Sequence, residues 1–145
     1  MNLLKQFAIW LSTASKDTPE HAVLRFQRKR AALQQEFLGR ASQSGRPRGL
    51  RWAECQWQDT QQLLRERSTG TLTLLIGINV QFEAIEGGDM EDVAAVSMIR
   101  DACAVFFYSA GVWRTDGRTL FNMNPESAAA RLIESYEPTS CNIAK

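Results

Sequence analysis

Apolar and polar residues alternate along the run from Thr71 to Ile85. The apolar positions share one parity: Leu72, Leu74, Ile76, Ile78, Val80, Phe82 and Ala84. Because successive side chains of a β-strand point to opposite faces of the sheet, this period of two predicts a long strand with one buried face. Gly77 lies on the other parity, where it predicts a bend or a bulge. A chain with such a strand must build a sheet and cover its apolar face.

A helix is predicted before this strand. Asp17-Thr18-Pro19-Glu20 is typical of a helix start, because Asp or Thr caps the first turn and proline fits into it. The helix is expected to run to about Arg40, where a polar stretch with glycine and proline begins. Gln27, Arg30 and Gln34 fall inside its apolar arc. That arc is otherwise made of Ala22, Val23, Leu24, Phe26, Ala31, Leu33, Phe37, Leu38 and Ala41.

Four further segments are expected to be strands of the same sheet. Leu50–Trp57 is the first, and it is expected to turn at Gln58-Asp59-Thr60. Gln61–Arg67 fits a short helix or a strand, and we expect a strand, because the loop that follows it ends in glycine, as hairpin loops often do. Val93–Tyr108 and Val112–Met123 are expected to be the last two strands.

A three-residue loop, Ser109-Ala110-Gly111, is expected to join these last two strands. Such a loop places Phe106 opposite Arg114 on one face of the sheet and Phe107 opposite Trp113 on the other. We expect the face with Phe107 and Trp113 to be the buried one.

These elements predict an α+β fold in which one long helix packs on a curved antiparallel meander of four or five strands. Short helices are expected at both ends, one within residues 1–16 and one that begins at Asn124-Pro125 and runs to Tyr136. A chain of 145 residues has the usual size of one domain. We therefore expect a single domain, 1–145, with an amphipathic segment 1–16, a core 17–136 and a flexible tail 137–145.

Charge is divided unevenly along the chain. Residues 1–51 carry ten Lys and Arg against three acids, a net charge of +7, whereas residues 52–145 carry seven against thirteen, a net charge of −6. Such asymmetry is typical of a nucleic-acid-binding arm, or of a basic helix that lies on an acidic sheet. We expect the second arrangement, because the whole chain carries only +1 and has little positive field to attract phosphate.

The counts of cysteine and histidine argue against the common metal and disulfide frameworks. Cys55, Cys103 and Cys141 are an odd number at wide spacings, and His21 is the one histidine, so no zinc set can be assembled. Three reduced thiols in a cytoplasmic protein are expected. The acidic stretch 83–92 lacks the ligand spacing of a calcium loop, and no phosphate-binding loop occurs. No metal and no cofactor are therefore expected.

Residues 1–16 place Leu3, Leu4, Phe7, Trp10 and Leu11 at helical spacing. The apolar part is short for a signal peptide and lacks a clean cleavage site, and it is far shorter than a membrane span. An amphipathic helix of this kind lies on a membrane surface or docks on its own domain. We expect docking.

The order of elements over residues 17–123, a helix followed by a meander of long strands, resembles the nuclear-transport-factor-2-like and cystatin-like folds. That resemblance implies a helix on the concave side of a curved sheet. The segments Gly49–Trp52, Phe82–Gly88 and Phe121–Pro125 resemble parts of short uncharacterised bacterial proteins of planctomycete type. This second resemblance implies no activity and no functional residues.

The candidate binding site is a polar pocket between the helix and the sheet. Gln27, Arg30 and Gln34 are expected to line it from the helix, and Asp101 and Tyr108 from the strands. The competing arrangement, which we expect over an open pocket, is a closed core in which Arg30 pairs with an acid such as Asp101.

The expected function is a small binding or protein-interaction module without catalytic activity, which associates with itself or with another protein through the sheet face. The alternative is an enzyme or a small-ligand binder that uses the pocket. Catalytic residues stay unassigned. Neither nucleic-acid binding nor membrane contact by residues 1–16 is expected.

Overall fold

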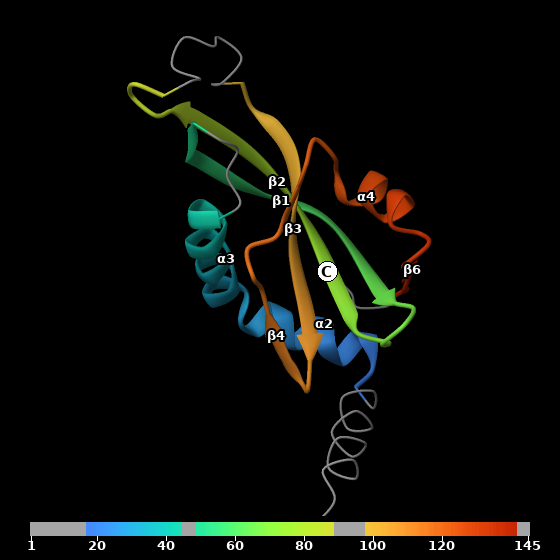
Figure 1. The fold of residues 1–145 in the computed structure, drawn as a ribbon. Helices are drawn as coiled ribbons and strands as arrows, with labels where there is room; N and C mark the ends of the chain where they lie inside the picture. Colours follow the sequence, from blue (N-terminus) through green and yellow to red (C-terminus); the bar gives the residue numbers. More distant parts are fainter. Residues whose placement is uncertain (1–16, 45–48, 89–97, 142–145) are drawn as a thin grey trace, which may run out of the picture.

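The computed structural model describes residues 17–44, 49–88 and 98–141, with an α+β arrangement of helices and one antiparallel sheet (Figure 1). The six strands are ordered β4-β3-β2-β1-β6, and β5 pairs with β3 beside β4. The elements are α2 (Pro19–Arg28), α3 (Arg30–Ser44), β1 (Leu50–Glu66), β2 (Leu72–Ala84), β3 (Arg100–Ser109), β4 (Val112–Arg114), β5 (Thr119–Phe121), α4 (Pro125–Arg131) and β6 (Tyr136–Pro138).

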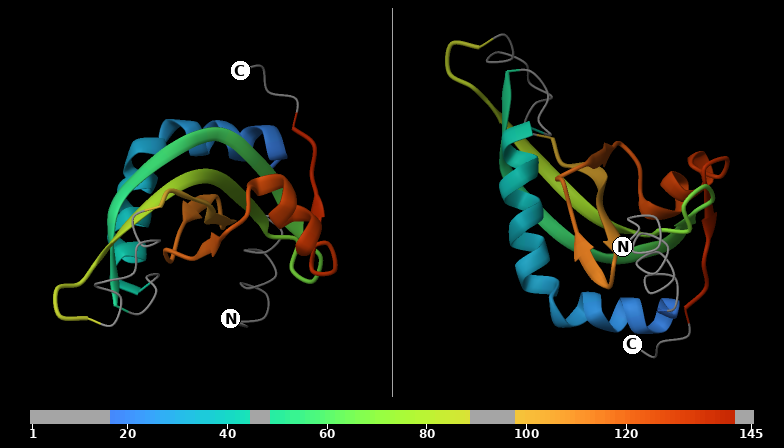
Figure 2. Two further views of the ribbon diagram at one scale, coloured as in Figure 1. Left: turned by 90° about the horizontal axis from the view of Figure 1, so that it is seen from above. Right: turned by 60° about the horizontal axis from the view of Figure 1, so that its bottom comes forward.

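The prediction of one long helix on a four- or five-stranded sheet is wrong. The helix is interrupted at Lys29: α2 ends at Arg28, and α3 begins at Arg30. Figure 2 shows the two helices meeting at a corner, while β1 and β2 arch strongly. The corner lets Phe26 of α2 and Phe37 of α3 both bury their rings against the curved sheet, from which a straight helix would diverge.

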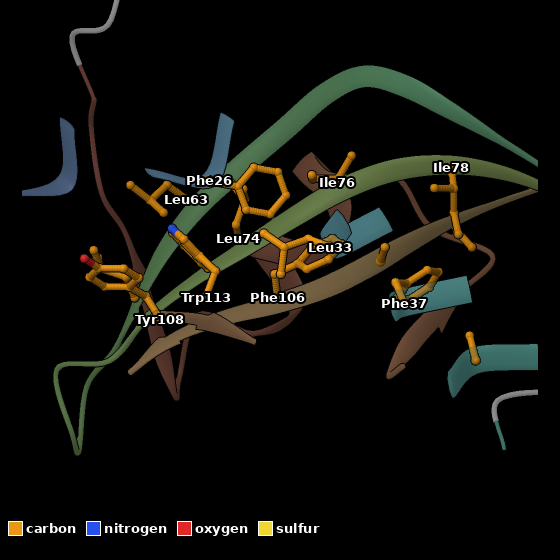
Figure 3. Packing of buried hydrophobic residues seen from close by; sticks show 14 of the residues in the cluster. Phe26, Leu33, Phe37, Leu63, Leu74, Ile76, Ile78, Phe106, Tyr108 and Trp113 are labelled. Carbon is orange, nitrogen blue, oxygen red and sulfur yellow. The ribbon is translucent and has the colours of Figure 1, made fainter. Parts of the chain in front are cut away.

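Two apolar clusters hold the sheet, one on each face. The larger lies under α2 and α3, and Figure 3 shows its rings and branched side chains interleaved. Phe106 lies at its centre. The centroid of its ring is 5.0 Å from that of Phe26 and 5.9 Å from that of Phe37. The smaller cluster lies under α4, and it joins Leu64, Leu75, Cys103, Val105, Ala128 and Ala129. The strand predicted over 71–85 is confirmed as β2, but from Leu72 to Ile78 it is buried on both faces.

The first strand is longer than expected. The turn predicted at residues 58–60 is instead an irregularity within β1, where the pairing with β2 shifts between Trp57 and Gln61. Gly77 lies opposite this irregularity, and a Cβ atom there would collide with the side chain of Thr60. The glycine thus allows β1 to continue through the bend. The strand predicted over 61–67 is confirmed as the second half of β1.

The hairpin between β3 and β4 has a two-residue turn, so the expected three-residue loop is wrong. Ala110 has φ 53° and Gly111 has φ 77°, the paired positive values of a type I′ turn, whose twist matches that of the strands. Tyr108 consequently pairs with Trp113, and Phe107 with Arg114. Trp113 is on the core face as expected, but Phe107 is on the opposite face, because its neighbours Phe106 and Tyr108 belong to the larger cluster.

The strands expected at 93–108 and 112–123 are shorter or divided. In the described residues β3 begins at Arg100, and Met98 and Ile99 are exposed outside it. The second segment forms two short strands, β4 and β5, because residues 115–118 between them interrupt the regular pairing with β3. Gly117 in this loop has φ 84° and packs against the end of α3.

The C-terminal helix begins where expected but ends earlier. Asn124 caps α4 by accepting a hydrogen bond from Ser127 N at 2.8 Å, and Asn124 N donates to Ser127 Oγ at 3.1 Å. The helix ends at Arg131, and β6 then pairs with β1. Glu137 and Pro138, assigned above to a flexible tail, belong to this strand. The division of the chain into a segment 1–16, a core and a tail otherwise stays a prediction.

The helix expected within residues 1–16, and residues 89–92 of the acidic stretch, lie outside the described residues. No helix in the described ranges is long and apolar enough to cross a membrane.

Candidate functional site

The five residues of the pocket expected from sequence lie in different surroundings. Gln27 is exposed, Gln34 is half-buried, and Arg30 places its guanidinium 5.9 Å from the centre of the Phe26 ring. Asp101 is exposed and lies on the face of β3 opposite to Tyr108, because the residues of a strand alternate between faces. The structure therefore does not bring Asp101 together with Arg30 or Tyr108.

Tyr108 instead forms a contact at the start of the described chain. It is 5% exposed, and its hydroxyl donates a short hydrogen bond to the Asp17 carboxylate. Burial and this hydrogen bond raise the pKa of Tyr108 to about 12. The side chain is thus a neutral donor at neutral pH, and it fixes Asp17 beside the turn of the β3–β4 hairpin.

A groove of about 610 Å³ lies at the corner between α2 and α3, against the tip of this hairpin. Its floor is apolar and comes from α3 and β4: Leu33, Val112 and Trp113. Leu33 and Trp113 are buried, whereas Val112 is 51% exposed. The interruption at Lys29 creates the corner, so the feature that sequence analysis missed is also the one that shapes this groove. We call it the corner groove.

The rim of the corner groove is positively charged. Arg25 and Arg28 come from α2, and Lys29 follows them at the corner. The one acid on the rim, Glu36, is paired with Arg40 at 3.3 Å. The corner groove therefore presents three cations and no uncompensated carboxylate among its described residues. His21, the one histidine of the sequence, is exposed at the same rim.

Two long-range hydrogen bonds hold the walls of the corner groove together. The Arg25 guanidinium donates to the carbonyl oxygen of Gly111 at 3.0 Å. Trp113 Nε1 donates to the carbonyl oxygen of Ala22 at 2.6 Å, and this bond is buried. Both bonds join α2 to the hairpin, so the wall and the floor are fixed relative to each other before any ligand binds.

The sequence contained part of the signal for the corner groove. Arg25, Arg28 and Lys29 lie on the polar side of the predicted helix, where charged residues are usually only solvated. What was missing was their neighbour in space. Gly111–Trp113 lie more than eighty positions away along the chain, and no local pattern connects them to the helix.

The structure offers no group for metal binding in the part of the chain that it describes, where no three His, Cys, Asp or Glu side chains gather suitably. Of the acids considered for calcium, Asp89, Glu91 and Asp92 lie outside that part. All three cysteines are free. Burial raises the pKa of the Cys55 and Cys103 thiols to about 12, so neither is an ionised nucleophile at neutral pH.

Comparison with protein-family models, with curated protein sequences and with solved structures yields no match to this chain.

Proposed function

We propose that this protein is a binding module, and that the corner groove holds a segment of a partner protein that carries acidic residues around an apolar side chain. The observation that carries the proposal is the combination of an apolar floor with a cationic rim. An apolar side chain of the partner would cover Val112, which is half exposed, and would contact Leu33 and Trp113. Carboxylates of the partner beside this apolar side chain would contact the cations of the rim.

The rim favours carboxylates because its cations are available. No ion pair to another described residue involves Arg28 or Lys29, and both are exposed. Arg25 uses one nitrogen for Gly111 and keeps the remaining donors of its guanidinium. Exposed charges steer the encounter and select the partner, while the buried apolar contact supplies most of the affinity. A basic partner would be repelled by the same surface.

The test uses two synthetic acidic peptides of equal length and charge, one with a central leucine and one with a central serine. Fluorescence anisotropy at low salt should show saturable binding of the leucine peptide and weaker binding of the serine peptide. Arg28→Glu should weaken binding of the leucine peptide by about tenfold, because an exposed attraction is replaced by a repulsion of similar size.

Arg131→Glu is the matched control, because it changes the net charge equally but lies at the end of α4, on the other face of the sheet. It should leave binding within about twofold of wild type, since long-range effects between exposed charges are weak and screened. Equal binding of the two peptides would contradict the apolar floor. Preferential binding of a short single-stranded RNA over both peptides would contradict the choice of partner.

The proposal extends to the setting in which the module works. Three free cysteines support a reducing compartment, and we place the protein in the cytoplasm. Self-association through the sheet face, the absence of nucleic-acid binding, and docking of residues 1–16 rather than membrane contact stay predictions.

A further inference from the structure

A second pocket, of about 310 Å³, lies on the face of the sheet opposite to α2 and α3. Its floor is formed where Thr73 of β2 pairs with Phe107 of β3. Tyr136 of β6 stands on one side and the loop with Asp116 and Arg118 on the other. We call it the hydroxyl pocket, because Thr71, Thr73 and Ser109 all line it. It shares no residue with the corner groove.

The hydroxyl of Thr73 is the feature that distinguishes this pocket. Among the described residues the buried polar side chains are Thr73, 5% exposed, and Thr115, 4% exposed. Thr115 is satisfied, because its hydroxyl donates to Val105 O at 3.0 Å and accepts from Gly117 N at 3.1 Å. The Thr73 hydroxyl makes no hydrogen bond to any described residue. Among the described residues the fully buried side-chain nitrogen or oxygen without a partner is Trp52 Nε1, so the Thr73 hydroxyl, which lines the pocket, keeps access to solvent. It is therefore available to bond a ligand that enters the pocket.

The charges around the hydroxyl pocket disfavour an anion. Glu66 and Asp116 line it with Arg118, two carboxylates against one guanidinium. Glu66 already accepts from Ser68 and Thr69, at 3.2 and 3.0 Å, and Asp116 accepts from the backbone N of Arg118 at 3.0 Å. These bonds fix the carboxylates in place and leave them lone pairs for a ligand. The pocket thus offers acceptors, donors and hydroxyls, with no net attraction for phosphate or sulfate.

The remaining surface of the hydroxyl pocket is aromatic. Phe107 and Tyr136 are both half-buried, so each exposes part of a ring. A ligand that fits must combine an apolar C–H face with several groups that both donate and accept hydrogen bonds. A sugar ring in its chair form has this composition, with hydroxyls around the edge and C–H groups on the faces. The volume is at the low end of small-molecule sites, which suits a single ring.

We propose that the hydroxyl pocket binds a neutral pyranose sugar, with the ring against Phe107 and one sugar hydroxyl bonded to Thr73. The test is an NMR titration of the ¹⁵N-labelled protein with the methyl glycosides of glucose, galactose and mannose. At least one should give saturable shifts at the amides of Thr73, Phe107 and Ser109. Glucose 6-phosphate should bind more weakly than glucose, because the carboxylates repel its charge.

Thr73→Val tests the role of the hydroxyl in binding without disturbing the fold. Valine has the shape of threonine, and no protein group loses a hydrogen-bond partner. The variant should melt at or above the wild-type temperature and bind the preferred glycoside about three- to tenfold more weakly, the value of one neutral hydrogen bond. Phe107→Leu should weaken binding as well. Arg28→Glu, in the corner groove, should bind the glycoside like wild type.

Three outcomes would overturn the proposal: no saturable shift at these amides with any of the three glycosides, wild-type affinity in Thr73→Val, or tighter binding of the phosphorylated sugar. A lower melting temperature of Thr73→Val would show a hidden protein partner of the hydroxyl and would count against it too. Failure here leaves the corner groove unaffected, because the two pockets lie on opposite faces and are probed by different ligands.

Discussion

Gly117→Ala is expected to be among the most damaging single-methyl changes in this protein. Gly117 has φ 84°, a backbone conformation that costs an L-residue about 1–2 kcal/mol. In addition, a Cβ atom there would lie 2.6 Å from Ala41 N and 2.8 Å from the carbonyl carbon of Arg40. These are backbone atoms of α3, so no side chain can rotate away.

The collision adds a packing cost to the conformational one. Either α3 or the loop 115–118 must move by several tenths of an ångström, and overpacking of this kind costs about 1–3 kcal/mol. The total loss in the free energy of unfolding should therefore be about 2–5 kcal/mol. Urea denaturation followed by tryptophan fluorescence measures it, with an unchanged m-value as evidence that only the native state is affected.

Gly70→Ala is the matched control. Gly70 has φ 77°, close to that of Gly117, but no atom lies within 4 Å of a Cβ placed there. It should therefore show the conformational cost alone, about 1–2 kcal/mol. If the two variants lose the same stability, the close approach of the loop to α3 is not present in solution, and the argument fails.

Three further changes test the core, Arg30 and the thiols by urea denaturation. Phe82→Ala should cost about 3–5 kcal/mol, because the ring is 1% exposed, and a loss below about 1 kcal/mol would place it in solvent. Arg30→Met should cost less than about 1 kcal/mol, because the guanidinium lies over Phe26 without an ion pair to a described residue; a loss above about 3 kcal/mol would reveal a buried pair. The raised pKa of Cys55 and Cys103, about 12 against 9.0 for a free thiol, means that the unfolded chain releases these protons first. Stability should hold below pH 9.0 and decline towards pH 12, less steeply in a variant with both replaced by alanine; an identical decline would contradict the shifts.

Elements with strong local signals were predicted well. The alternation along 71–85 identified β2, because a period of two is a property of the strand itself. The start of α4 followed from three consecutive residues, Asn124-Pro125-Glu126, which are typical of a cap and a first turn. Such signals do not depend on which distant segment lies nearby.

Elements decided by distant contacts were not predicted. The apolar residues keep helical spacing across Lys29, so the sequence has no signal for the interruption, which follows from the arch of the sheet. The strand β6 was not predicted: Tyr136 was expected to end a helix and residues 137–145 to form a flexible tail. A short strand beside β1 has no periodicity of its own, and proline usually stops a helix. The expected pocket grouped Asp101 with Tyr108, although their spacing along the strand argues against a shared face. Asp101 and Tyr108 differ by an odd number of residues, so a regular strand places them on opposite faces.

The position of α4 and β6 has a consequence for synthesis. Leu64, Leu75 and Cys103 are made early in the chain, but the helix and strand that cover them come from residues 125–138. While a ribosome is still making this chain, the larger cluster can close and the other face of the sheet stays bare. Nascent chains stopped before residue 125 should therefore bind chaperones or aggregate, since an apolar sheet face without its cover is a surface for misassembly. Synthesis of residues 125–138 thus ends this exposure.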